Sequence, residues 1–106
     1  MYRLRRVSRT KLGQAYNVAK LVYKQSKLLQ DAGHRGEFTV CYNGATLPGE
    51  TNIVILEWQD DVLMSPRRPG NDIPPEVLAI QREYPALIES QHIEFYEILD
   101  PSQISD

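Results

Sequence analysis

The chain has 106 residues, of which 42% are hydrophobic, and its 12 basic and 14 acidic side chains give a formal net charge of -2. This size fits one compact domain spanning residues 1–106, and the slightly acidic balance argues against nucleic acid as the main partner. The single cysteine, Cys41, excludes an internal disulfide and a CxxC zinc or redox motif, and no apolar run has the length of a signal peptide core or a membrane span. We therefore expect a soluble, unprocessed, cytoplasmic protein.

The first part of the chain predicts a strand followed by a helix. Residues 1–7 alternate between two faces, one of which carries Tyr2, Leu4 and Arg6. Ser8 or Thr10 offers a hydroxyl group that would cap a helix running to about residue 30, and Gly33 suits its end. The face expected to pack carries Leu12, Ala15, Tyr16, Ala19, Val22, Tyr23, Ser26 and Leu29.

The middle of the chain predicts a hairpin whose second strand is central. Residues 37–43 alternate as a half-buried strand does, and a loop rich in Gly and Pro connects them to residues 51–60. The β-branched run at Ile53, Val54 and Ile55 is dense enough for a strand buried on both faces. We expect it to lie in the middle of a sheet.

The last part of the chain predicts a second helix and a final strand. Residues 61–74 are irregular and rich in proline, with room for one helical turn at 61–64. Pro75 suits a first helical position, and Pro85 should kink or split the helix. Residues 92–99 then form a strand, and a frayed tail follows.

The element order β-α-β-β-α-β predicts an α+β, ferredoxin-like fold. Two interleaved split βαβ units give a four-stranded antiparallel sheet with both helices on one face and the first and third strands at its centre. Neither face of the third or fourth strand is cleanly polar, so the bare face should be covered. A second copy of the chain could cover it sheet to sheet, which would make a homodimer.

The order and the segment Ile55-Leu56-Glu57-Trp58-Gln59-Asp60 resemble the dimeric α+β barrel proteins, which include the NIPSNAP-like and antibiotic biosynthesis monooxygenase-like families. The resemblance covers nearly the whole chain. It implies a homodimer with a small pocket between sheet and helices in each subunit and, in some relatives, oxidation of aromatic substrates without a cofactor. The proline-rich segment 61–74 departs from the pattern and holds no histidine, which puts oxygenase or metal-linked chemistry in doubt.

Charged residues of the sheet form the first candidate constellation. Arg3 and Arg5 project to the same side of a central strand, where Glu57 and Glu94 would be neighbours. Such residues form either a structural ladder of opposite charges or an arginine site for a substrate carboxylate. The hypothesis of a carboxylate site gains weight if an arginine inside a pocket lacks a partner.

His92 and Tyr96 are the candidate catalytic pair, because they share one face of a strand and His92 is the plausible acid or base near the sheet. His34 and His92 share no motif with other ligands, so no metal site is expected. Cys41 has no visible base beside it, which favours a buried, inert thiol. Arg67 and Arg68 are either a solvated pair in a loop or a binding site for an anion or a partner.

The aromatic residues are either core or the lining of a ligand pocket. They are Tyr16, Tyr42, Trp58, Tyr84 and Tyr96. The candidate substrate-binding residues are Arg5, Tyr16, Tyr42, Glu57 and Trp58.

Two functions remain open at this point. The first is binding or transformation of a small molecule, aromatic or otherwise, between sheet and helices, without a cofactor. The alternative is a non-catalytic ligand-sensing or protein-interaction module on the same fold. An RNA-recognition domain would need exposed aromatics with basic neighbours, which residues 41–43 and their surroundings do not supply. An acylphosphatase would need a phosphate-cradling loop after the first strand, and none is present.

Overall fold

The structure is a computed structural model, and it describes residues 1–62 and 72–104. The strands are β1 (Tyr2–Thr10), β2 (Phe38–Asn43), β3 (Ile53–Asp60) and β4 (Ile88–Glu97). The helices are α1 (Ala15–Asp31) and α2 (Pro75–Glu83), with short 3-10 turns η1 (Tyr84–Leu87) and η2 (Pro101–Gln103). The predicted helical turn at 61–64 lies partly outside the described residues, and the Arg67–Arg68 pair lies wholly outside them.

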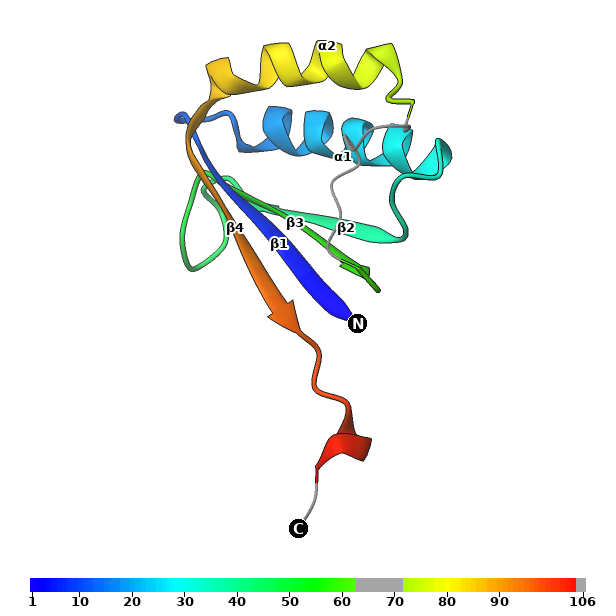
Figure 1. Ribbon diagram of the computed structural model, residues 1–106. Helices are drawn as coiled ribbons and strands as arrows, with labels where there is room; N and C mark the ends of the chain where they lie inside the picture. The colour runs from blue at the N-terminus through cyan, green and yellow to red at the C-terminus, as the bar shows by residue number, and fades with distance from the viewer. Residues whose placement is uncertain (63–71, 105–106) are drawn as a thin grey trace.

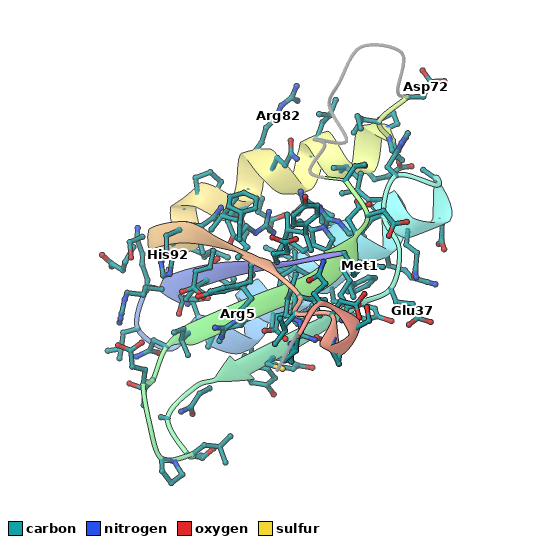
Figure 2. All side chains as sticks on the ribbon, turned by 60° about the horizontal axis from the view of Figure 1, so that its bottom comes forward. Met1, Arg5, Glu37, Asp72, Arg82 and His92 are labelled. Atoms are coloured by element: carbon teal, nitrogen blue, oxygen red, sulfur yellow. The ribbon has the colours of Figure 1, made fainter. Side chains whose placement is uncertain are left out.

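The four strands form one antiparallel sheet in the order β2-β3-β1-β4. The β2–β3 hairpin and the central positions of β1 and β3 are thus confirmed. Both helices lie on the same side of the sheet, α1 against β2 and β3 and α2 beside α1 (Figure 1). The chain therefore has the predicted ferredoxin-like arrangement, and neither α1 nor α2 covers the opposite side, the open face (Figure 2).

The core lies between α1 and the central strands. It consists of Ala15, Val18, Ala19, Val22, Val54 and Leu56, and Trp58 packs against it at the end of β3. The predicted apolar stripe of α1 is right for five positions but wrong for Leu12, Tyr16 and Tyr23, which are exposed. Gln25 is buried instead, because the helix turns its long polar side chain toward the sheet.

The predicted hydroxyl cap of α1 is wrong. Strand β1 continues to Thr10, so Ser8 lies in the sheet, and the helix starts after Gln14 with no side-chain cap. A tight turn separates them, in which Gly13 has φ 77°. The other helix boundaries agree with the sequence, since Gly33 follows the end of α1 with φ 81° and Pro85 separates α2 from η1. Strand β4 starts four residues earlier than expected, at Ile88.

Within the described residues, neither helix has the length and apolar character needed to cross a membrane.

Candidate functional site

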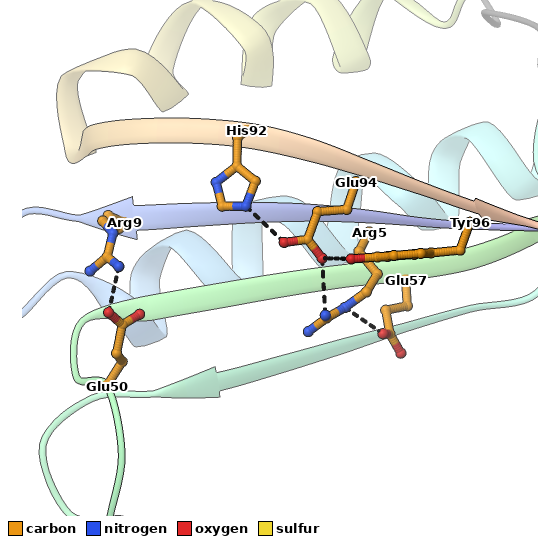
Figure 3. Close-up of polar contacts among 7 residues, drawn as sticks. All are labelled: Arg5, Arg9, Glu50, Glu57, His92, Glu94 and Tyr96. Carbon is orange, nitrogen blue, oxygen red and sulfur yellow. Dashed lines mark hydrogen bonds and ion pairs between the residues drawn. The ribbon is translucent and has the colours of Figure 1, made fainter.

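A polar cluster occupies the middle of the open face. Strand register places Arg5 between Glu57 of β3 and Glu94 of β4. The Nε of Arg5 lies 2.7 Å from Oε1 of Glu57 but is not aligned for a hydrogen bond, and its Nη1 donates to Oε1 of Glu94 at 3.0 Å (Figure 3). Arg5 is thus neutralised by two carboxylates, as expected of a structural ladder.

Glu94 also joins the two candidate catalytic residues. His92 Nε2 lies 2.9 Å from Oε2 of Glu94, and the Tyr96 hydroxyl donates to Oε1 at 3.0 Å (Figure 3). The hydrogen bonds from His92 and Tyr96, followed by the charge of Arg5, hold the pKa of Glu94 below its usual range. The same hydrogen bond raises the pKa of the Tyr96 hydroxyl, because the proton is shared with an anion. His92, Glu94 and Tyr96 therefore form one hydrogen-bonded chain on β4.

Glu94→Gln is expected to flatten the loss of thermal stability on acidification. The folded pKa of Glu94 lies below the ordinary value of 4.5, so its contribution to stability is present above that value and is lost as pH falls through the folded pKa. Carboxylates take up protons between about pH 5 and pH 3. Over this range the melting temperature of the native protein should fall more steeply than that of the variant. Glu89→Gln, at an exposed position of the same strand, is the control and should keep the native slope. Equal slopes for native protein and Glu94→Gln would contradict this.

The other predicted residues lie on the helix side of the sheet. Tyr16 of α1 and Tyr42 of β2 form a tilted aromatic pair with ring centroids 5.8 Å apart, and both are exposed in part. Trp58 lies under the guanidinium of Arg35, whose Cζ is 4.3 Å from the ring centroid. The structure thus splits the predicted residues into two groups, with Arg5, Glu57, His92 and Tyr96 on the open face and Tyr16, Tyr42 and Trp58 on the helix side.

A second polar set lies between the sheet and the helices, and sequence reasoning missed it. Arg6 of β1 points toward α1, where its Nη2 is 3.5 Å from Oε1 of Gln25, and its guanidinium lies 5.6 Å from the ring centroid of Tyr84. Ser8, two residues along β1, shares a hydrogen bond with the Tyr84 hydroxyl. The sequence did contain a signal for this polar set. Arg6 and Ser8 follow Leu4 at alternate positions of β1, so they point toward the helices, where apolar side chains are normal.

A groove of about 560 Å³ opens at the edge of the sheet, where β2 begins and β3 ends. Its lining residues are Arg3, Glu37, Phe38, Thr39, Glu57, Trp58 and Gln59. Two predicted substrate-binding residues, Glu57 and Trp58, contribute to it from opposite faces of β3. The groove therefore links the open face with the helix side at one end of the sheet.

The structure also places His34 and Cys41, the residues weighed for metal and thiol chemistry from the sequence. No group of three or more His, Cys, Asp or Glu side chains is placed to hold a metal ion in residues 1–62 and 72–104. His34 instead contacts the backbone carbonyl of Asp72. Cys41 is exposed on the open face, so the expectation of a buried thiol is wrong, because β2 is an edge strand and its outward row has no cover.

The same fold occurs in solved structures at low sequence identity. A NIPSNAP family protein from Agrobacterium tumefaciens is 20% identical with a TM-score of 0.66, and 98% of each chain is covered. A candidate antibiotic biosynthesis monooxygenase from Deinococcus radiodurans is 13% identical with a TM-score of 0.66, and each chain is covered completely. A dimeric protein of unknown function with a ferredoxin-like fold, from Bacteroides fragilis, is 18% identical with a TM-score of 0.60, covering 92% of this chain and 95% of that one.

These likenesses establish the fold of the chain. The chain has the ferredoxin-like α+β fold that NIPSNAP and antibiotic biosynthesis monooxygenase-like structures share, as the sequence resemblance implied. No protein-family model matches the sequence, and no curated protein does so either. Because all of the identities are low, the comparisons establish the fold, and function has to be argued from the residues.

Proposed function

We propose that this protein binds a small organic molecule between its sheet and its helices, as a homodimer in which the open faces of two sheets meet. The observation that carries the proposal is the unused hydrogen-bonding capacity of that layer. Arg6 Nε and Gln81 Oε1 are buried without a hydrogen-bond partner among the described residues. Buried polar atoms are nearly always paired, so such atoms mark a place where a ligand or water completes the structure.

The surroundings of these atoms suit a small, partly aromatic ligand. Gln81 lies one turn before Tyr84 on the side of α2 that buries Val77 and Ile80, so it faces the same layer as Arg6. Trp58 and Tyr84 supply aromatic surface there. Aromatic walls with a few convergent polar groups are the usual composition of a small-molecule site.

The homodimer is supported by the open face itself. Val7, Ile53 and Ile55 form an apolar group on its central strands, next to the cluster around Arg5. The charges of that cluster are already paired within one chain, so a second sheet could cover them without leaving an isolated charge. The Bacteroides fragilis protein, which has the same fold, is dimeric.

We propose binding rather than catalysis for this layer. His92 and Tyr96, the candidate catalytic residues, lie on the opposite side of the sheet from Arg6 and share their protons with Glu94. A ligand in the layer between sheet and helices would not reach them. We therefore favour a ligand-binding or ligand-sensing role over catalysis by this pair.

Ligand screening through Trp58 tests the proposal. Trp58 is the one tryptophan of the sequence and lies at this site, so its fluorescence should report an occupant directly. We expect members of a panel of neutral and charged single-ring aromatic compounds to change the emission, and to shift the amide resonances of Gln25, Ser26 and Gln81 in a nuclear magnetic resonance titration. Shifts confined to the open face, or none at millimolar concentrations, would contradict binding in this layer.

A further inference from the structure

Two arginines from distant parts of the chain contact neighbouring residues of α1. Arg6 comes from the inward row of β1, and Arg35 comes from the loop between α1 and β2. Arg6 contacts Gln25 at 3.5 Å, and Arg35 donates from Nη1 to Oγ of Ser26 at 3.1 Å. Gln25 and Ser26 are consecutive residues of α1 with only 5% and 0% of their surface exposed, so both guanidinium groups contact the buried side of the same helical turn.

Strand register also places Arg6 near Trp58, the ring that Arg35 covers. Leu4 pairs with Trp58 and Arg6 pairs with Leu56, so Arg6 is a diagonal neighbour of Trp58 on the helix side. The guanidinium of Arg35 lies over that same ring. The guanidinium of Arg6 itself lies over the ring of Tyr84.

This arginine pair, Arg6 and Arg35, has no carboxylate partner among the described residues. The ion pairs of the described arginines involve Arg5 and Arg9, which contact Glu57, Glu94 and Glu50 on the outer surface. Burial lowers the pKa of Arg6, and burial together with the charge of Arg6 lowers the pKa of Arg35 to about 10. The two like charges therefore repel each other in a place where burial already disfavours each of them.

The contacts of the arginine pair do not fully compensate its positive charge. The rings of Trp58 and Tyr84 attract the guanidinium groups, and Gln25 and Ser26 each accept one bond. Each guanidinium has five N–H donors, and Arg6 Nε is among the buried atoms with no partner. Both arginines are half-buried. A charge taken partly out of water without a counter-charge is destabilising, and a bound anion would offset that cost at both residues.

We infer that the arginine pair of Arg6 and Arg35 is the recognition site for the oxyanion of a small organic acid whose flat apolar body lies against Trp58 or Tyr84. Guanidinium groups match carboxylate and phosphate oxygens with paired hydrogen bonds, and both share this oxyanion chemistry. The inference rests on the proposed ligand site between sheet and helices and names the class of its ligand.

The first test compares probes of equal shape and different charge on the full-length protein. Benzoate and phenyl phosphate provide the two kinds of oxyanion, benzamide is the neutral counterpart of benzoate, and inorganic phosphate tests an anion without an apolar body. We expect benzoate or phenyl phosphate to bind at least about 10-fold more tightly than benzamide, measured by calorimetry and by Trp58 emission. Which of the two binds more tightly decides between carboxylate and phosphate.

The second test removes one charge at a time. Arg6→Gln and Arg35→Gln should each weaken the tighter oxyanion by about 10-fold or more while leaving benzamide binding unchanged, because only the charged group contacts the guanidinium. Arg9→Gln is the matched control, since it removes the same charge from the outer face of the same strand, where Arg9 pairs with Glu50. Should either variant fail to fold, the comparison of probes on the native protein still decides.

The outcomes separate the inference from the proposed function. Equal binding of benzoate, phenyl phosphate and benzamide within this layer, unaffected by both substitutions, would overturn the inference and leave the ligand site standing. Binding of inorganic phosphate as tight as that of phenyl phosphate would overturn the part that concerns the apolar body. Failure of every probe to perturb Gln25, Ser26 or Trp58 would overturn both.

Discussion

Leu56→Ala is expected to lower the free energy of unfolding by about 4 kcal/mol. Leu56 lies on the central strand β3 with 1% of its surface exposed, and it belongs to the core cluster with Val18, Val22 and Val54. The substitution would leave a cavity in the layer where α1 meets the sheet, because the backbone of a central strand has little freedom to collapse into it. Small domains are stable by roughly 5–15 kcal/mol, so this one change removes a large share.

Urea unfolding followed by circular dichroism would measure that loss. Leu12→Ala is the matched control, because Leu12 is 88% exposed and its truncation should change stability by less than about 0.5 kcal/mol. A loss below about 1 kcal/mol for Leu56→Ala would mean that Leu56 is not in a packed core.

Ile55→Lys is expected to convert the proposed homodimer into a monomer that keeps its fold. Ile55 lies on the open face of β3, paired with Val7 on one side and Cys41 on the other. In a monomer its side chain is half-buried at the surface, where a lysine could extend into water. In a dimer joined through this face, the lysine would be an unpaired buried charge, so the dissociation constant should rise by about 100-fold or more.

Analytical ultracentrifugation of the native protein and the variant would measure this change, with circular dichroism to verify the fold. Leu12→Lys introduces the same charge at a solvated position outside the sheet and should leave the association state unchanged. A native protein that sediments as a monomer, or an Ile55→Lys variant that dimerises as the native protein does, would refute assembly through the open face.

The sheet divides the polar residues of this protein into two sets with different properties. On the open face, Arg5 has two carboxylate partners and the network is self-contained. On the helix side, Arg6 has an amide and an aromatic ring but no counter-charge among the described residues. Adjacent residues of one strand therefore serve different purposes because successive side chains point to opposite faces. The first set suits a covered interface, and the second suits a charged ligand.

Local pattern was enough to predict most of the fold. The β-branched run at 53–55 marked a central strand, Gly33 and Pro85 marked helix boundaries, and the element order allowed few topologies for a chain of this length. These features succeed because they depend on backbone preferences and on burial periods that a short window of sequence contains. The prediction of a hydroxyl cap for α1 failed because strand β1 continues through Ser8 and Thr10. The Ser8 hydroxyl bonds to Tyr84 of η1, and the Thr10 hydroxyl donates to the backbone carbonyl of Lys11.

The candidate site could be predicted only in part. Strand alternation put Glu57 and Trp58 on opposite faces of one strand and His92 with Tyr96 on one face of another, but it did not say which strands are neighbours. The register brings Arg5, Glu57, His92 and Tyr96 together on the open face, away from Tyr16, Tyr42 and Trp58. The sequence by itself determined the elements, their order and the sheet alternation, because those follow from nearest-neighbour chemistry. Only the tertiary structure decided that Arg6 and Arg35, which lie 29 positions apart in the sequence, contact the same turn of α1 and have no carboxylate partner among the described residues. That result depends on how α1 crosses the sheet and on which side chains it buries, and a charge in a sequence does not reveal whether its counter-charge is within reach.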